Sequence, residues 1–115
     1  MTTSLWKAAD ETVQQLRAAG VRATMDVRNL NLPCVLVVPP AIVLDANCGG
    51  TATFTAYAVS RGPGNADAWK SLDELLEKTA AVIDVEEVRT SQYTIDETGA
   101  LPALEIVWTQ ALSWP

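Results

Sequence analysis

Histidine is absent from the sequence, and cysteine occurs only twice, at Cys34 and Cys48. Histidine is the side chain most often used as a general base and as a metal ligand. Its absence therefore removes the commonest routes to acid–base catalysis and to transition-metal binding. No serine lies in a G-x-S-x-G motif, and no zinc or EF-hand spacing is present. We predict a protein that is not an enzyme and that has no cofactor and no metal site.

The acidic residues include three adjacent pairs, Asp10–Glu11, Asp73–Glu74 and Glu86–Glu87. Neighbouring residues on a helix or a strand point in different directions, so none of these pairs is arranged to share a proton. Solvated helix and edge-strand surfaces explain them. Glycine clusters in residues 48–51 and 62–64, but neither segment matches a nucleotide-binding motif, and a plain turn is the simpler interpretation.

The two cysteines lie on adjacent predicted strands. Reduced, buried thiols are the expected state of both in a cytosolic chain. A disulfide between Cys34 and Cys48 is the alternative, because adjacent strands bring such residues within bonding distance.

Basic residues are also few: eight Lys and Arg stand against fourteen Asp and Glu, a net charge of −6. This balance argues against tight nucleic-acid binding. No apolar run approaches the roughly 18 residues that span a bilayer, and the start of the chain lacks the pattern of a signal peptide. With 115 residues, 49% of them hydrophobic, we expect a single folded domain over residues 1–115 that is made in a cytosol.

Two segments have the apolar periodicity of helices, residues 4–19 and residues 66–83. The first is followed by a stop at Gly20. Its apolar stripe consists of Leu5, Ala9, Val13 and Leu16. The stripe of the second consists of Trp69, Leu72, Leu76, Thr79 or Ala80, and Ile83.

The remaining regular segments have the pattern of strands. They cover residues 21–27, residues 34–38 with a continuation through 41–45, and residues 51–60, 85–96 and 101–112. Pro39 and Pro40 interrupt the second strand, which predicts an edge strand, a bulge or a kink. A turn at residues 45–50 makes residues 34–60 one long hairpin. The last two strands form another hairpin, with an exposed edge along residues 85–96.

These elements predict an α+β fold in the order α-β-β-β-α-β-β. We expect a two-layer sandwich with a mostly antiparallel sheet and both helices on one face. On the strand over residues 51–60, one side carries Ala52, Phe54, Ala56 and Ala58, and small alanines would let a helix approach closely. The opposite side, the threonine face, consists of Thr51, Thr53, Thr55 and Tyr57, and no helix is expected over it.

The four tryptophans have different expected roles. Trp69 and Trp108 fall on predicted core stripes, and Trp6 lies beside one, either in the core or at its rim. Trp114 is in the terminal tail. Because tryptophan is enriched at the centres of interfaces, Trp114 is a candidate for partner docking, with packing on its own domain as the alternative.

Several stretches resemble tail terminator proteins of long-tailed, siphovirus-type phages of actinobacteria. They are Leu36–Pro40, Cys48–Gly50, Thr55–Tyr57, Gly62–Trp69, Pro102–Leu104 and Val107–Thr109. The resemblance extends from about residue 5 to residue 112, and the order of elements also agrees with the fold of that family. None of these motifs is a chemical signature.

The resemblance implies a structural virion protein without enzymatic activity or cofactor. Such a protein assembles as a homo-oligomeric ring, usually a hexamer, on the head-proximal end of the tail tube. It ends tube polymerisation and provides the surface that joins the head. Its partners would be copies of itself, the major tail tube protein and a head-completion or stopper protein. Genomic DNA would pass through the lumen without specific binding, and no membrane is involved.

The implied location is the head-proximal end of the virion tail, and the host cytoplasm during assembly. Two other functions stay open: another head–tail neck component, an adaptor or stopper, and a cytosolic binding domain of similar fold.

Candidate interface residues lie mostly at the ends of predicted elements, where loops carry contacts. The turn at residues 45–50 and the loop at residues 61–65 are the main ones. The predicted interface residues are Asp45, Asn47, Arg61, Asn65, Tyr57 and Trp114.

Overall fold

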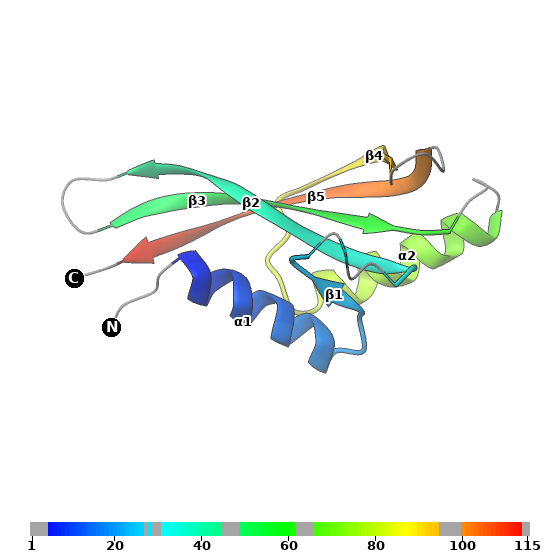
Figure 1. Cartoon of the computed structure of the whole chain (residues 1–115), viewed down its shortest axis with the longest axis horizontal. Coiled ribbons are helices and arrows are strands. Elements are labelled where there is room, and N and C mark those ends of the chain that lie inside the picture. Colours follow the sequence, from blue (N-terminus) through cyan, green and yellow to red (C-terminus); the bar gives the residue numbers. More distant parts are fainter. Residues whose placement is uncertain are drawn as a thin grey trace.

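The computed structural model describes residues 5–26, 28, 31–44, 49–61, 66–94 and 100–113. Over these residues the protein is α+β, with two helices and one five-stranded mixed sheet (Figure 1). The elements are α1 (Leu5–Ala18), β1 (Ala23–Thr24), β2 (Cys34–Leu44), β3 (Gly49–Val59), α2 (Ala66–Ala80), β4 (Glu87–Thr94) and β5 (Ala100–Ser113). The predicted order α-β-β-β-α-β-β is confirmed.

The strands are arranged in the order β1-β2-β3-β5-β4. The β2–β3, β3–β5 and β4–β5 pairs are antiparallel, as both predicted hairpins require. β1 instead pairs parallel to β2 through Ala23 with Val35 and Thr24 with Leu36, which makes the sheet mixed. A strand was predicted over residues 21–27, but the observed strand, β1, is only two residues long.

The two prolines of β2 interrupt its pairing with β3 but do not end the strand. The register shifts between Val38 and Ala41, so three steps along β2 face two steps along β3, from Thr55 to Thr53. This is the arrangement of a β-bulge, and it accommodates residues that lack an N–H donor. Of the three outcomes predicted for Pro39 and Pro40, the bulge is observed, and so is the edge, since among the described residues β1 pairs with β2 only at Val35 and Leu36.

Helix α1 ends where the sequence predicts. Gly20 has a φ of 87°, a left-handed conformation that glycine adopts without steric cost. The Val21 N–H donates to the Leu16 carbonyl at 2.9 Å, and the Gly20 N–H donates to the Arg17 carbonyl at 3.0 Å. This pair of bonds is the Schellman motif, which satisfies carbonyls left free at a helix end.

The core joins side chains from both helices to the alanine side of β3. Phe54 is fully buried and stacks on Trp108 of β5, with ring centroids 5.4 Å apart and planes 8° from parallel. Both helices lie below the sheet in the view of Figure 1. The helix residues of this core are Ala8, Ala9, Val13, Leu16, Leu72 and Leu75. No helix of the described segments is long and apolar enough to cross a membrane.

The predicted burial of the first residue in each helical stripe was wrong. Leu5 is exposed, and so is Trp69, with 54% of its surface accessible. In α2 the buried positions are Ala68, Leu72, Leu75 and Thr79, a helical series that places Trp69 about 100° further around the axis. Ile83 is buried as expected, although α2 ends at Ala80.

Candidate interaction surface

The two edges of the sheet differ from each other in how much of their length is covered. β1 covers β2 only at Val35 and Leu36, and the Val35 N–H donates to the Arg22 carbonyl at 2.8 Å. Beyond Leu36 no other strand of the described residues pairs with the outer side of β2. This outer side of residues 37–44 is named the β2 edge. An uncovered edge presents backbone groups that can pair with another chain.

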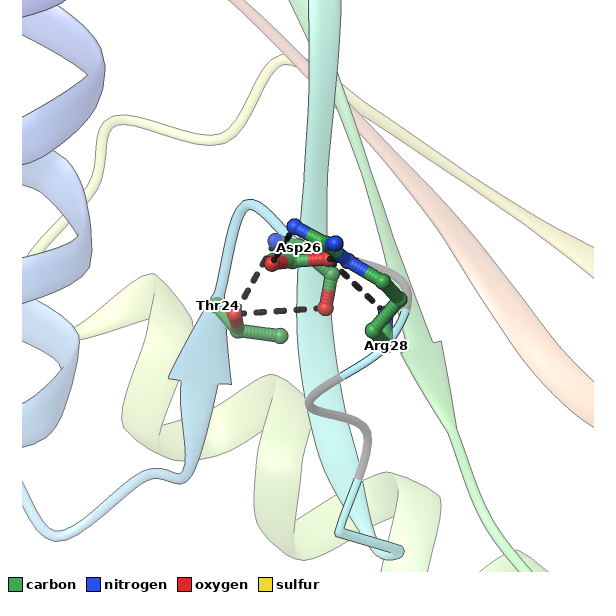
Figure 2. A network of polar contacts seen from close by, with 3 residues as sticks. All are labelled: Thr24, Asp26 and Arg28. Carbon is green, nitrogen blue, oxygen red and sulfur yellow. Dashed lines mark hydrogen bonds and ion pairs between the residues drawn. The ribbon is translucent and has the colours of Figure 1, made fainter.

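A polar turn explains why β1 stops so early (Figure 2). The Asp26 N–H donates to Thr24 Oγ1 at 3.0 Å, and the Arg28 N–H donates to Asp26 Oδ1 at 2.9 Å. The Arg28 guanidinium also binds both carboxylate oxygens of Asp26, each at 3.1 Å. This side-chain bonding is the main cause that holds the pKa of Asp26 below its ordinary value. Local bonds of this kind offer the backbone an alternative to the sheet, and here they end β1 at Thr24.

The β2 edge is apolar and uncharged. Three consecutive residues near its end are exposed, Ile42 by 38%, Val43 by 68% and Leu44 by 70%. Ile42 pairs with Ala52 and so lies on the helix side of the sheet, whereas Val43 pairs with Thr51 on the threonine face. Apolar side chains are therefore exposed on both faces of the same strand.

A shallow apolar groove of about 220 Å³ lies beside the first part of the β2 edge. Trp6 of α1 lines it and is 68% exposed, which places this side chain at the rim instead of in the core. The groove is lined by Leu5, Trp6, Ala9, Met25, Val37, Val38, Pro39 and Pro40. The exposed apolar surface thus extends from the start of α1 to the end of β2.

The opposite edge, the outer side of β4, is mostly polar. All eight residues of β4 are exposed or half-buried. Arg89 donates to Glu87 at 2.8 Å, and this bond is the main cause of the raised pKa of Arg89. On the helix side, Trp69 shares a groove with Thr90 and Gln92. This outer side of β4 is named the β4 edge.

Glu86, just before β4, protects part of β5 that β4 does not reach. Its carboxylate accepts the Thr109 N–H at 2.6 Å and also the Thr109 hydroxyl. Its own N–H donates to the Val107 carbonyl at 2.9 Å. The Glu86 carboxylate therefore accepts the hydrogen bond of the Thr109 N–H, which the backbone of a longer β4 strand would otherwise accept.

The threonine face predicted from the alternation of β3 is present. Thr51 is exposed, and Thr53, Thr55 and Tyr57 are half-buried. Tyr57 makes a tilted contact with Tyr93 of β4, with ring centroids 5.4 Å apart. At the other end of the same face Val59 is buried, so only part of the face is accessible.

Of the predicted interface residues, the structure describes Tyr57 and Arg61. Arg61 is exposed, and its Nε donates to the Leu32 carbonyl at 3.2 Å, so the side chain also holds the segment that leads into β2. The other four lie outside the described residues: Asp45, Asn47, Asn65 and Trp114. Neither Tyr57 nor Arg61 belongs to the β2 edge: Tyr57 pairs with Leu36, just before that edge begins, and Arg61 contacts Leu32.

Cys34 is buried as a free thiol, and Cys48 lies outside the described residues. Burial is the main cause of the raised pKa of the Cys34 thiol, which keeps it protonated and unreactive at neutral pH. Within the described segments no three His, Cys, Asp or Glu residues are placed to hold a metal ion.

Sequence reasoning missed Ile42, Val43 and Leu44 as surface residues. Their apolar character indicates a buried strand, and periodicity alone does not show where the covering helices end. The available signal was the absence of any charged residue between Pro33 and Leu44 in a strand that the two prolines place near an edge.

No family model matches the sequence, and no curated protein matches it.

Proposed function

We propose that this protein is a structural component of a phage tail, a terminator that forms a ring on the head-proximal end of the tail tube. The ring ends tube polymerisation and presents the surface to which the head-completion or stopper protein binds. The observation that carries this proposal is the exposed part of the sheet: an apolar β2 edge that no described strand covers, and a partly accessible threonine face. Such surfaces in a small domain favour assembly with other subunits.

The resemblance to tail terminators of long-tailed actinobacterial phages supports the proposal. The resembling residues that the structure describes belong to regular elements that build the sheet and support it. Leu36–Pro40 lies in β2, Thr55–Tyr57 in β3, and Pro102–Leu104 and Val107–Thr109 in β5, while Ala66–Trp69 begins α2. The resemblance therefore concerns the framework of the domain.

We interpret the domain as a two-layer sandwich with both helices on one face of the sheet. Support comes from the single core cluster, which joins residues of α1 and α2 to Phe54 and Trp108. With the helices on one side, the other face is left for contacts with neighbouring subunits.

The proposed partners are further copies of the chain, in a ring of six, together with the major tail tube protein and the head-completion protein. Genomic DNA passes through the lumen without specific binding, which the net charge of −6 favours because like charges repel. The protein acts without enzymatic activity or cofactor, in the host cytoplasm during assembly and then in the virion tail.

Deletion of the gene in its phage tests the proposal. We expect tails of irregular and excessive length that do not join heads, because a tube that adds like rings stops only at a ring with a different distal face. Tail lengths are measured by electron microscopy, and complementation with the intact gene is the control. If tail lengths stay uniform and only head attachment fails, the protein is an adaptor or stopper instead.

A further inference from the structure

We propose that the β2 edge of one copy pairs with the β4 edge of the next copy, so that the sheet continues from subunit to subunit. This inference rests on the ring assembly proposed above and specifies the contact that builds the ring. It assigns the exposed apolar end of β2 to a second copy of this chain.

The backbone of the β2 edge is oriented for strand addition. Along an antiparallel strand the N–H and C=O groups of alternate residues point to the same side. The Val35 N–H points outward to Arg22, so the backbone N–H and C=O of Val37, two residues further, also point outward. The bulge at the prolines then shifts this alternation. After it, the backbone groups of Ala41 and Val43 point toward β3, and those of Ile42 and Leu44 point outward.

The β4 edge has matching outward groups. Val107 and Thr109 of β5 point toward β4, since they bind Glu86 through the Val107 carbonyl and the Thr109 N–H. Glu87 pairs with Val107, so its backbone groups point toward β5, and the same holds for every second residue after it. The backbone groups of the residues in between point outward. The outward residues of β4 are Val88, Thr90, Gln92 and Thr94. The β4 edge has 8 residues, the same length as residues 37–44 of the β2 edge.

The strand directions favour a head-to-tail contact. Successive strands β2, β3, β5 and β4 alternate in direction, because each pair is antiparallel. A rotation about an axis along the strands keeps β2 of the next copy parallel to β2 of the first. That strand therefore runs antiparallel to the adjacent β4, which continues the existing pattern. A contact between two different edges is heterologous, and such contacts close into rings when the rotation permits.

The register also determines how neighbours are offset. Glu87 pairs with Val107, Val107 with Thr55, and Thr55 with Val38, so the start of β4 lies level with Val38. The open part of β2 extends from there in the opposite direction to β4. Neighbouring copies must therefore be displaced along the strands by a few residues. Closed sheets have such a stagger because their strands tilt relative to the ring axis.

With this stagger Ile42 approaches the start of the neighbouring β4, where Val88 lies. Both side chains are on the helix side of the sheet, since Ile42 pairs with Ala52 and Val88 pairs with Ile106. They are exposed to nearly the same extent in the single chain, 38% and 37%. The junction buries both and so removes apolar surface from water.

Cross-linking between two distinguishable chains tests the contact. Both chains carry Cys34→Ala and Cys48→Ala, with the fold checked by circular dichroism; one also carries Ile42→Cys and the other Val88→Cys. A short bismaleimide is added to the mixture in the presence of tail tubes. We expect a cross-linked heterodimer as the main product. Val82→Cys in place of Val88→Cys is the matched control, because Val82 is also 37% exposed but follows α2.

A second experiment separates this contact from ring formation in general. Ile42→Lys places a charge on the edge, as natural edge strands do to prevent pairing, and we expect at least a tenfold loss of rings by native mass spectrometry. Val82→Lys is the control and should assemble as the unaltered protein does. If rings persist with Ile42→Lys, the proposed β2–β4 contact is overturned, but the proposed ring assembly is not. Cross-links between two Ile42→Cys chains overturn it in favour of a two-fold β2–β2 contact. Monomers alone, even with tubes, overturn the proposed function and with it this inference.

Discussion

The two edges of the sheet show how one domain can present a mostly polar strand on one side and an apolar strand on the other. The β4 edge is mostly polar, with Val88 as its exposed apolar residue; it carries the Glu87–Arg89 ion pair and is preceded by Glu86, whose carboxylate satisfies the Thr109 N–H. The β2 edge has two prolines but no charged residue, and it ends in exposed Ile42, Val43 and Leu44.

Uncontrolled strand edges lead to aggregation, and proteins usually protect them with charges, prolines, bulges or covering segments. Here Pro39, Pro40 and the bulge interrupt the β2 edge without covering it. The exposed apolar residues at its end are the surface that the proposed contact with a second copy would cover. Under the proposed contact the difference between the edges gives the assembly a polarity, in which one edge provides apolar area and the other provides a mostly polar strand.

The largest expected effect concerns the core that both edges share. Trp108→Ala removes a side chain that is 3% exposed and stacks on Phe54. We expect the free energy of unfolding to fall by about 3–5 kcal/mol, through lost burial and the cavity left behind. Urea denaturation followed by circular dichroism measures it. Trp6→Ala, at a tryptophan that is mostly exposed, is the control and should change it by less than about 0.5 kcal/mol. Equal effects of the two variants would contradict the core assignment.

The next effect compares the helices that accompany the two edges. Thr79 of α2 is fully buried, and its hydroxyl has no hydrogen-bond partner among the described residues, whereas the Thr12 hydroxyl of α1 donates to the Ala8 carbonyl at 2.9 Å. Thr79→Val keeps the shape and removes the unsatisfied group, so we expect stabilisation of about 1–2 kcal/mol. Thr12→Val is the matched control and loses a hydrogen bond, so it should not stabilise. Thermal unfolding of the two variants measures the difference, and a destabilised Thr79→Val would show that the hydroxyl is satisfied.

The smallest effect concerns the protection of β5 by Glu86. Glu86→Ala removes the acceptor of the Thr109 N–H, and we expect a loss of about 0.5–1 kcal/mol because the site is exposed to solvent. Glu86→Gln retains a neutral acceptor and should lose less. Hydrogen exchange of the Thr109 amide should accelerate in Glu86→Ala and remain slow in Glu87→Ala, whose ion pair with Arg89 is on the surface. Equal exchange rates in both variants would mean that Glu86 does not protect the Thr109 amide of β5.

The sequence alone determined the order of elements and much of their local geometry. Alternation along β3 separated the alanine side from the threonine face, because side chains of a strand point to opposite faces in turn. Gly20 ended α1, because glycine adopts the left-handed conformation that a Schellman motif requires. Pro39 and Pro40 marked a break in β2, because neither has an N–H to donate.

Only the tertiary structure decided which apolar residues are covered. Trp69 and Leu5 satisfy helical periodicity as well as their buried neighbours do, but a helix contacts the sheet along one narrow line that periodicity defines only to within about one residue. The parallel pairing of β1, and its end at the Thr24–Asp26–Arg28 turn, depend on where the chain returns in space. The exposure of Ile42, Val43 and Leu44 follows from both, since among the described residues no strand lies on the outer side of that part of β2. Local sequence specifies which faces a strand has, and only the arrangement of the other elements specifies which of them meet water.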